Sequence, residues 1–178
     1  MTGPGDFAAT LTLAEARRLS APMQLAASAE ACAAIAARLG LVGIAALTAD
    51  LRVVPDGDAV GVTGHVRARV TQNCVATGEP VDGDVDTAVL VRFVPFAALE
   101  AAEEGAEIEL ATEELDVIGY TDGRIDVGAM AIDTLALALD PYPRRADADA
   151  WLRAHGVKAE EDVGAFSALA ALRDRLNT

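Results

Sequence analysis

Apolar and polar residues alternate along three long stretches of the chain, and this period of two is typical of half-buried β-strands. The stretches are residues 47–54, 60–70 and 84–95. The turn sequence PDGDA separates the first two, which predicts an antiparallel hairpin. We also expect shorter extended segments at residues 7–13, 22–27 and 113–120.

Two stretches instead repeat their apolar residues with the period of an α-helix. The first runs over residues 29–39, with Ser28 as a suitable N-cap and Gly40 after its last turn. Cys32 shares one helical face there with Ile35 and Leu39, which predicts a packed, structural cysteine. The second helix covers residues 127–139, which follow the N-cap candidate Asp126 and are apolar nearly all round. A third, short helix is expected near the C-terminus, at residues 165–176.

Long strands follow one another without crossover helices, which favours an α+β fold over a doubly wound one. We therefore predict an antiparallel curved sheet or partial barrel, with two main helices and a short C-terminal helix. Residues 1–143 are predicted to form a single α+β domain, with its core at about 7–143 and an acidic loop at about 98–112. Residues 144–178 are predicted to be a polar tail that carries the C-terminal helix.

The composition restricts the core and the partners. Hydrophobic residues make up 52% of the chain, enough for a real core, but aromatic ones only 4%, so the core should consist of small and aliphatic side chains. The formal net charge of −14 repels nucleic-acid phosphates, so neither DNA nor naked RNA is the expected partner. Basic protein surfaces, including those of ribosomal proteins, suit this charge better. Two cysteines, no recognisable signal peptide and no long apolar run predict a cytoplasmic protein without a membrane segment.

The sequence offers no complete metal or catalytic set. Asp82, Asp84 and Asp86 resemble the start of a calcium loop, but the required later positions hold Thr87 and Phe93. The two cysteines and two histidines lack the close pairs that zinc sites use, so no metal and no cofactor is predicted.

Cys74 by itself could be a nucleophile, half of a metal site, or a small residue at the end of a strand. Its nearest histidine, His65, lies nine residues earlier in the same strand-like run, roughly 30 Å away if extended. A base is therefore missing, and the chain is predicted not to be an enzyme.

One strand face carries most of the basic candidates. His65, Arg67 and Arg69 share that face, and Arg92 joins them from the next strand. This basic strip is the best candidate for a phosphate or acidic contact. Cross-strand pairing with Asp84 and Asp86 is the alternative.

The segment "GHVRARVTQNCVATGEPVDGDVDTAVLVRFVP" resembles the central part of the YceD-like family, the large ribosomal RNA subunit accumulation proteins. The resemblance rests on a Cys-x-x-Thr-x-Glu-Pro-Val turn, here Cys74, Thr77, Glu79, Pro80 and Val81, and on a following Phe-x-Pro. The segments "SAEACAAIAARLGLVGIAALTADLRV", "ELDVIGYTDGRIDVGAMAIDTLALALDPYPR" and "GAFSALAALRDRL" are similar to other parts of the family. Gly78 stands where leucine is common, and Gly164 replaces a proline.

The resemblance implies a role in accumulation or processing of large-subunit ribosomal RNA, and so in assembly of the large subunit. It carries no catalytic residues. We expect the protein to bind a large-subunit ribosomal protein or assembly factor, with ribosomal RNA contacted indirectly. The alternatives are direct RNA binding through the basic strip and a thiol-dependent enzyme. The expected contact residues are His65, Arg67, Arg69, Cys74, Thr77, Glu79, Pro80 and Arg92.

Overall fold

The computed structural model describes residues 7–103 and 116–157 of the chain. The chain divides into two compact units. The first, which we call the sheet unit, comprises residues 1–71 and 82–140. The second, the turn unit, comprises residues 72–81 and 141–178.

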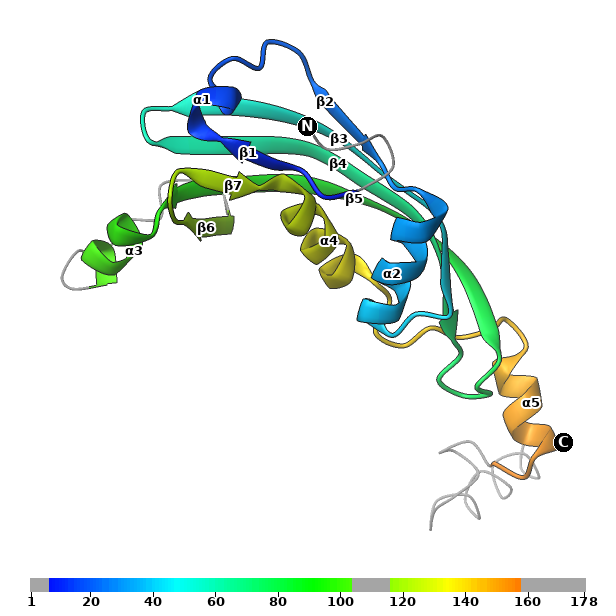
Figure 1. Ribbon diagram of the computed structural model, residues 1–178. Helices are drawn as coiled ribbons and strands as arrows, with labels where there is room; N and C mark the ends of the chain where they lie inside the picture. The colour runs from blue at the N-terminus through cyan, green and yellow to red at the C-terminus, as the bar shows by residue number, and fades with distance from the viewer. Residues whose placement is uncertain (1–6, 104–115, 158–178) are drawn as a thin grey trace, which may run out of the picture. The chain divides into compact units, whose positions relative to one another are not determined.

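Strands and helices alternate at the start of the chain, and long strands then follow one another (Figure 1). In chain order the elements are β1 (Thr10–Thr12), α1 (Leu13–Ala16), β2 (Met23–Ala26), α2 (Ala29–Leu39), β3 (Gly43–Asp56), β4 (Ala59–Asn73), β5 (Pro80–Pro95), α3 (Phe96–Glu103), β6 (Asp116–Tyr120), β7 (Arg124–Asp126), α4 (Val127–Ala138) and α5 (Ala148–Ala154). This confirms the predicted mixed α+β class.

An open sheet of five strands, in the order β2-β3-β4-β5-β6, forms the centre of the sheet unit. The β2–β3 and β3–β4 pairs are antiparallel, as predicted, but β6 lies parallel to β5. A parallel neighbour needs a long connection, and residues 96–115 supply one. The sheet is therefore mostly antiparallel and is not closed into a barrel.

The predicted hairpin is confirmed, and its two strands pair from Gly43–Thr71 to Asp56–Ala59. Its register joins Leu47 to Ala68 and Val53 to Val62, so the apolar sets of both strands lie on the same face. β5 begins at Pro80, four residues before the predicted strand. The alternation of Asp82, Asp84 and Asp86 with smaller residues places all three carboxylates at exposed positions.

The two main helices begin and end close to where the sequence predicts. Ser28 Oγ accepts a hydrogen bond from Ala31 N at 3.1 Å, and Gly40 follows α2 with φ of 67°. Asp126 Oδ1 accepts from Ala129 N at 2.8 Å at the start of α4. Both N-caps therefore satisfy a backbone N–H that the helix itself leaves unpaired.

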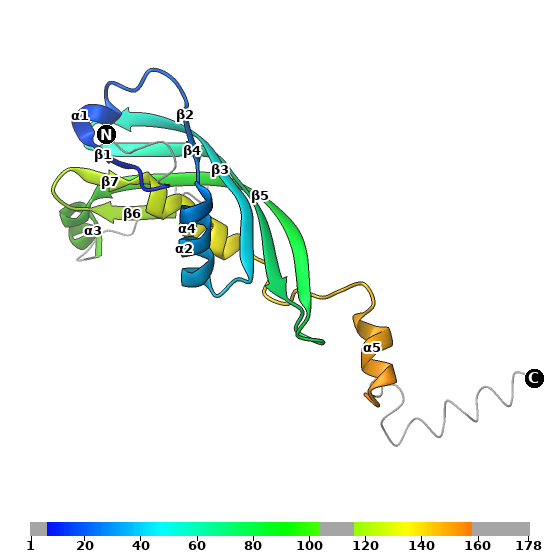
Figure 2. The same cartoon turned by 45° about the vertical axis from the view of Figure 1, so that its right-hand side comes forward.

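Both helices lie on the same face of the sheet, as two views show (Figures 1 and 2). Cys32 and Ile35 of α2 are buried there, as the helical spacing predicts. α4 is largely buried as expected, although Leu137 near its end is 85% exposed. The core is mostly valine, leucine, isoleucine and alanine, which confirms the small and aliphatic core residues expected from the composition.

The segment before β1 crosses the start of α4 at close range. Val127 N donates to Ala9 O at 2.9 Å. A Cβ on Gly128 would meet Phe7 O and would lie 2.7 Å from Ala9 N. Glycine is therefore required where the N-terminal segment passes over the helix.

Three predicted elements differ from the structure or fall outside it. Within the predicted strand 7–13, only β1 is extended, and it pairs with β7 in a separate two-stranded sheet. Its last residue, Thr12, caps α1 and forms a capping box with Glu15, which ends the strand. The first residues of the predicted acidic loop belong to α3, whose alanine-rich sequence favours a helix. The rest of that loop and the predicted helix 165–176 lie outside the described residues.

Candidate functional site

The Cys74–Val81 segment connects β4 to β5 through a turn that its own backbone closes. Cys74 N donates to Glu79 O at 2.8 Å, and Gly78 N donates to Cys74 O at 2.8 Å. Thr77 Oγ1 accepts from Glu79 N at 3.2 Å. The turn is thus closed by hydrogen bonds between its own residues.

A segment from much later in the chain belongs to the same unit and contacts this turn. Val75 N donates to Pro143 O at 2.9 Å. The N–H of Arg145 reaches the sulfur of Cys74. The turn and the 143–145 segment therefore form one site, which we call the thiol turn.

The thiol of Cys74 is surrounded by hydrogen-bond donors. The Thr77 hydroxyl contributes most, and the backbone N–H groups of Arg145, Ala76 and Thr77 add to it. Together they outweigh the cost of desolvation and lower the pKa of Cys74 from 9.0 to about 7. The side chain is only 2% exposed. A substantial fraction of this thiol is therefore ionised at neutral pH while it stays covered.

Carboxylates pair with both arginines of the thiol turn, Arg144 and Arg145. Arg145 binds Asp147 through two contacts, Nε to Oδ1 at 2.9 Å and Nη2 to Oδ2 at 3.0 Å. This guanidinium lowers the pKa of Asp147. Arg144 Nη2 binds Asp149 Oδ1 at 2.6 Å, in the first turn of α5. These pairs connect the thiol turn to the start of α5.

The groups that contact the Cys74 thiol are hydrogen-bond donors of the backbone and of Thr77. Such donors stabilise a thiolate. His155, the histidine of the turn unit, is engaged elsewhere. Its ring stacks on Trp151 at 3.8 Å between centroids, and its Nδ1 lies 2.8 Å from Trp151 O.

The basic strip lies on the sheet unit, and a carboxylate contacts each of its four side chains. His65 Nδ1 lies 2.8 Å from Asp86 Oδ1. The arginine contacts are Arg67 Nε to Asp86 Oδ2 at 3.1 Å, Arg67 Nη1 to Asp50 Oδ2 at 2.8 Å, Arg69 Nε to Asp84 Oδ1 at 3.3 Å and Arg92 Nη2 to Asp56 Oδ2 at 2.7 Å. The cross-strand pairing that the sequence left open is therefore present.

Electrostatics within the strip reflect this pairing. The hydrogen bond from His65 lowers the pKa of Asp86 most, and the hydrogen bond from Arg67 lowers it further. The same carboxylate, together with Asp50, raises the pKa of Arg67. The strip is thus a network of opposite charges and not an uncompensated cationic surface.

Neither a metal-binding cluster nor a membrane-spanning helix is present in the described residues. Over 7–103 and 116–157, no three His, Cys, Asp or Glu side chains converge as ligands would. None of the helices in these ranges is both long enough and apolar enough to cross a bilayer.

Comparison with known proteins connects these features to one family. The family model described as "Large ribosomal RNA subunit accumulation protein YceD" matches residues 62–173, more than half of the chain. The chain belongs to the YceD family. The match begins in β4 and includes both parts of the thiol turn. No curated protein and no solved structure matches the chain.

The predicted contact residues of this YceD-family chain fall in two groups. Cys74, Thr77, Glu79 and Pro80 lie in the turn unit, where hydrogen bonds join the first three. His65, Arg67, Arg69 and Arg92 lie in the sheet unit. Whether either group binds a partner stays a prediction.

Sequence reasoning missed the second half of the thiol turn. Pro143 lies in the segment ending DPYPR that resembles the family, and Arg145 follows it directly, but nothing local connects either residue to Cys74. Their contact spans about seventy positions, which no periodicity within one sequence records. Asp50 and Asp56 were also missed, although their positions on β3 follow from the hairpin register.

Proposed function

We propose that this protein is a non-catalytic factor that supports accumulation of large-subunit ribosomal RNA by binding a large-subunit protein or assembly factor. The family description supports the first half of this proposal, because it names accumulation of this RNA subunit. The charge distribution supports the second half.

The observation that carries the choice of partner is the pairing of the basic strip. Each of its three arginines and its histidine already has a carboxylate within hydrogen-bond distance. A phosphate would have to displace these carboxylates against the repulsion of a net charge of −14. A basic protein surface meets no such repulsion, so it is the better partner.

The thiol turn supports a non-catalytic role. Cys74 is nearly inaccessible, and its ionised form is stabilised by groups that hold the turn to residues 143–145. A catalytic thiolate must reach its substrate, whereas a structural one needs only its donors. Complementation of a deletion strain by Cys74→Ala would agree with this. Loss of function in a Cys74→Ala protein that still folds would favour thiol chemistry.

Capture with and without nuclease tests the partner directly. Tagged protein is recovered from cells, treated with ribonuclease, and its bound proteins are identified by mass spectrometry. We expect large-subunit proteins or assembly factors to remain after RNA is digested. Their complete loss after digestion would mean that RNA mediates the association, and this would overturn the proposal.

A matched pair of variants separates protein binding from direct RNA contact. Arg67→Gln with Arg69→Gln neutralises two cations of the strip, and Arg18→Gln serves as an exposed control elsewhere. In depleted cells that express each variant, we expect the same large-subunit peak on a sucrose gradient. A reduced peak only in the strip variant, with an unchanged melting temperature, would favour direct RNA binding.

A normal large-subunit peak in cells depleted of the protein would reject the role in subunit accumulation altogether. This depletion is therefore the first measurement, and the variants follow from it.

A further inference from the structure

The strand β6 lies at an edge of the five-stranded sheet. It pairs with β5 on one side, from Val91–Asp116 to Pro95–Tyr120, and no described strand follows it in the sheet order. Native edge strands usually carry lysine, proline or a bulge that prevents further pairing. The sequence DVIGY has none of these, so its edge is suited to accept another strand.

This edge is held firmly in place. Tyr120, at the end of β6, donates its hydroxyl to Asp58 O in the β3–β4 turn at 2.6 Å. At Gly119, a Cβ would lie 2.8 Å from Phe96 Cδ2 and 2.9 Å from Leu99 Cδ1, so α3 packs directly on the strand. A strand fixed at this end loses little conformational entropy when it binds a partner.

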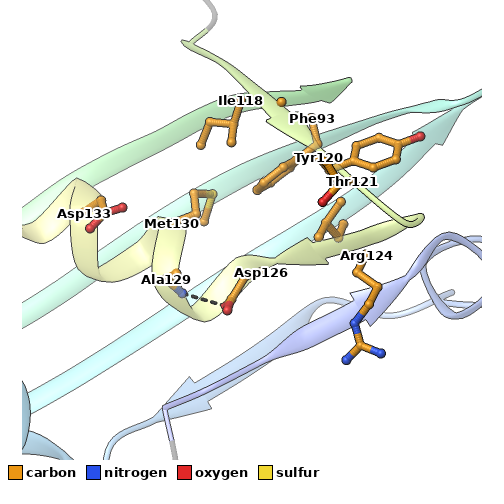
Figure 3. Close-up of a pocket in the computed structure, with 11 residues that line it drawn as sticks. Phe93, Ile118, Tyr120, Thr121, Arg124, Asp126, Ala129, Met130 and Asp133 are labelled. Atoms are coloured by element: carbon orange, nitrogen blue, oxygen red, sulfur yellow. Dashed lines mark hydrogen bonds between the residues drawn. The ribbon is translucent and has the colours of Figure 1, made fainter. Parts of the chain in front are cut away.

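A groove of about 240 Å³ adjoins β6 on the inner side of the sheet, between β6, β7 and α4 (Figure 3). Phe93, Ile118, Ile125 and Met130 supply its apolar floor. Its size suits a few aliphatic side chains, which every second residue of an added strand would direct into it.

Apolar side chains are also exposed on the other side of the same edge. Val117 of β6 and Phe96 of α3 are each 50% exposed. Glu100 lies one helical turn after Phe96, on the same side of α3, and is exposed. The stem of a lysine or arginine would cover Val117 and Phe96 while its charged end reaches Glu100.

The charges around this edge select a basic occupant. Asp116 begins β6, and Asp126 and Asp133 line the groove. Arg124 is the cation among the groove residues, and Figure 3 shows its side chain directed away from Asp133 and Met130. Asp133 also binds Arg38 at 3.3 Å but is largely exposed. Arg92, the β5 neighbour of Val117, is paired with Asp56 at 2.7 Å. The remaining carboxylates and the net charge of −14 therefore favour an occupant with positive charge.

We propose that the open edge of β6 and its groove bind an extended segment of a protein partner, in which aliphatic residues alternate with lysine or arginine. The segment pairs with β6 as an added strand, its aliphatic side chains enter the groove, and its cations lie on the opposite face of the strand, toward Glu100. This inference rests on the proposed function, because it assigns a place on the sheet unit to the basic protein partner.

Peptide binding by the full chain tests the proposal. The probe is a fluorescein-labelled nine-residue peptide in which lysine and valine alternate, and anisotropy measures its binding. A lysine–proline peptide has the same charge but cannot form a strand, and a glutamate–valine peptide forms strands with the opposite charge. We expect only the lysine–valine peptide to bind, with amide shifts in β6 detected by NMR.

Two valine variants provide the matched control. Val117→Lys places a like charge at the edge, and Val42→Lys places it at a position with nearly the same exposure, 51% against 50%. We expect Val117→Lys to weaken binding on the order of tenfold and Val42→Lys to leave it within about twofold. Melting temperatures check that both variants fold.

Four results would overturn the proposal: no binding of the lysine–valine peptide, equal binding of the lysine–proline peptide, tighter binding of the glutamate–valine peptide, or equal affinity in the two valine variants. Nuclease-resistant capture distinguishes failure of the β6 site from failure of the proposed function. If capture persists while the peptide result is negative, only the β6 site is wrong. If wild-type capture is lost with RNA, the proposed function itself fails.

Discussion

Cys74 owes its acidity to hydrogen-bond donors from two distant stretches of the chain. Thr77 and Ala76 lie in the same turn, whereas the N–H of Arg145 belongs to the segment after α4. These donors favour the thiolate more than the thiol, so the pKa falls to about 7 although the side chain is covered. The charge state of this one residue is therefore coupled to the folding of the turn unit.

The first prediction concerns the titration of this thiol. In a Cys32→Ala background, the ultraviolet absorbance of thiolate should rise with a midpoint near pH 7. Thr77→Val removes the largest contribution and should move the midpoint upward, toward the ordinary value of 9.0. Cys74→Ala should abolish the step. An unchanged midpoint in Thr77→Val would contradict the assignment of the hydroxyl as the main donor.

The second prediction concerns stability and pH. Because the folded state lowers the pKa of Cys74, the thiolate contributes stability in full above the unfolded pKa, near 9.0, and loses it as pH falls through about 7. The difference in unfolding free energy between wild type and Cys74→Ala should therefore increase from about pH 6 to about pH 9. Urea denaturation over this range measures it.

Cys32 is the control for that measurement, because burial raises its pKa. Its contribution is present below the unfolded pKa and is lost only at higher pH. Cys32→Ala should accordingly show no increasing difference from about pH 6 to about pH 9. A difference that grows equally for both variants would mean that the trend does not come from Cys74.

At the scale of elements, the sheet unit depends on close crossings that side chains would prevent. The N-terminal segment crosses α4 at Gly128, where its backbone at Phe7 and Ala9 occupies the space of a Cβ. This crossing brings Phe7 into the core, where it is 2% exposed. The close contact at Gly128 and the hydrogen bond from Val127 N to Ala9 O thus position the N-terminal segment against α4.

The third prediction tests this crossing. Gly128→Ala should lower the free energy of unfolding by about 1–3 kcal/mol, because the atoms that the new Cβ would meet belong to the backbone and cannot rotate away. Gly83→Ala is the control, since no atom lies within 4 Å of its added Cβ. Chemical denaturation of both variants gives the comparison. Equal stabilities would show that the segment moves aside without cost.

The elements themselves were largely predictable from the sequence. The hairpin, α2 and α4 follow from local periods and from the caps Ser28 and Asp126, which act on residues three positions away. The parallel placement of β6 was not predictable, because it depends on where a long connection returns the chain. The capping box of Thr12 and Glu15, which ends β1, is visible in the sequence, but the predicted extended segment runs past it to residue 13.

At the scale of the whole molecule, charge is the dominant feature. The chain has 28 acidic residues against 14 lysines and arginines, and the four side chains of the basic strip are paired with carboxylates. Such a surface attracts basic partners over distances set by ionic strength. The association with a partner should therefore depend strongly on salt.

The fourth prediction follows from this charge. Partners retained after nuclease treatment should be recovered well at about 50 mM salt and poorly at about 500 mM, because the screening length falls severalfold across this range. Quantitative mass spectrometry of eluates measures the loss. Retention that is independent of salt would point to an apolar interface in place of a charged one.

The sequence by itself determined the α+β class, the hairpin, both main helices, the aliphatic core and the acidic character of the molecule. These depend on composition and on contacts between residues a few positions apart, which a linear pattern records. The tertiary structure alone decided the acidity of Cys74, the partners of the basic strip and the exposed edge at β6. Each of these depends on groups brought together from distant positions, because hydrogen bonds and ion pairs act over a few ångströms in space whatever the separation along the chain.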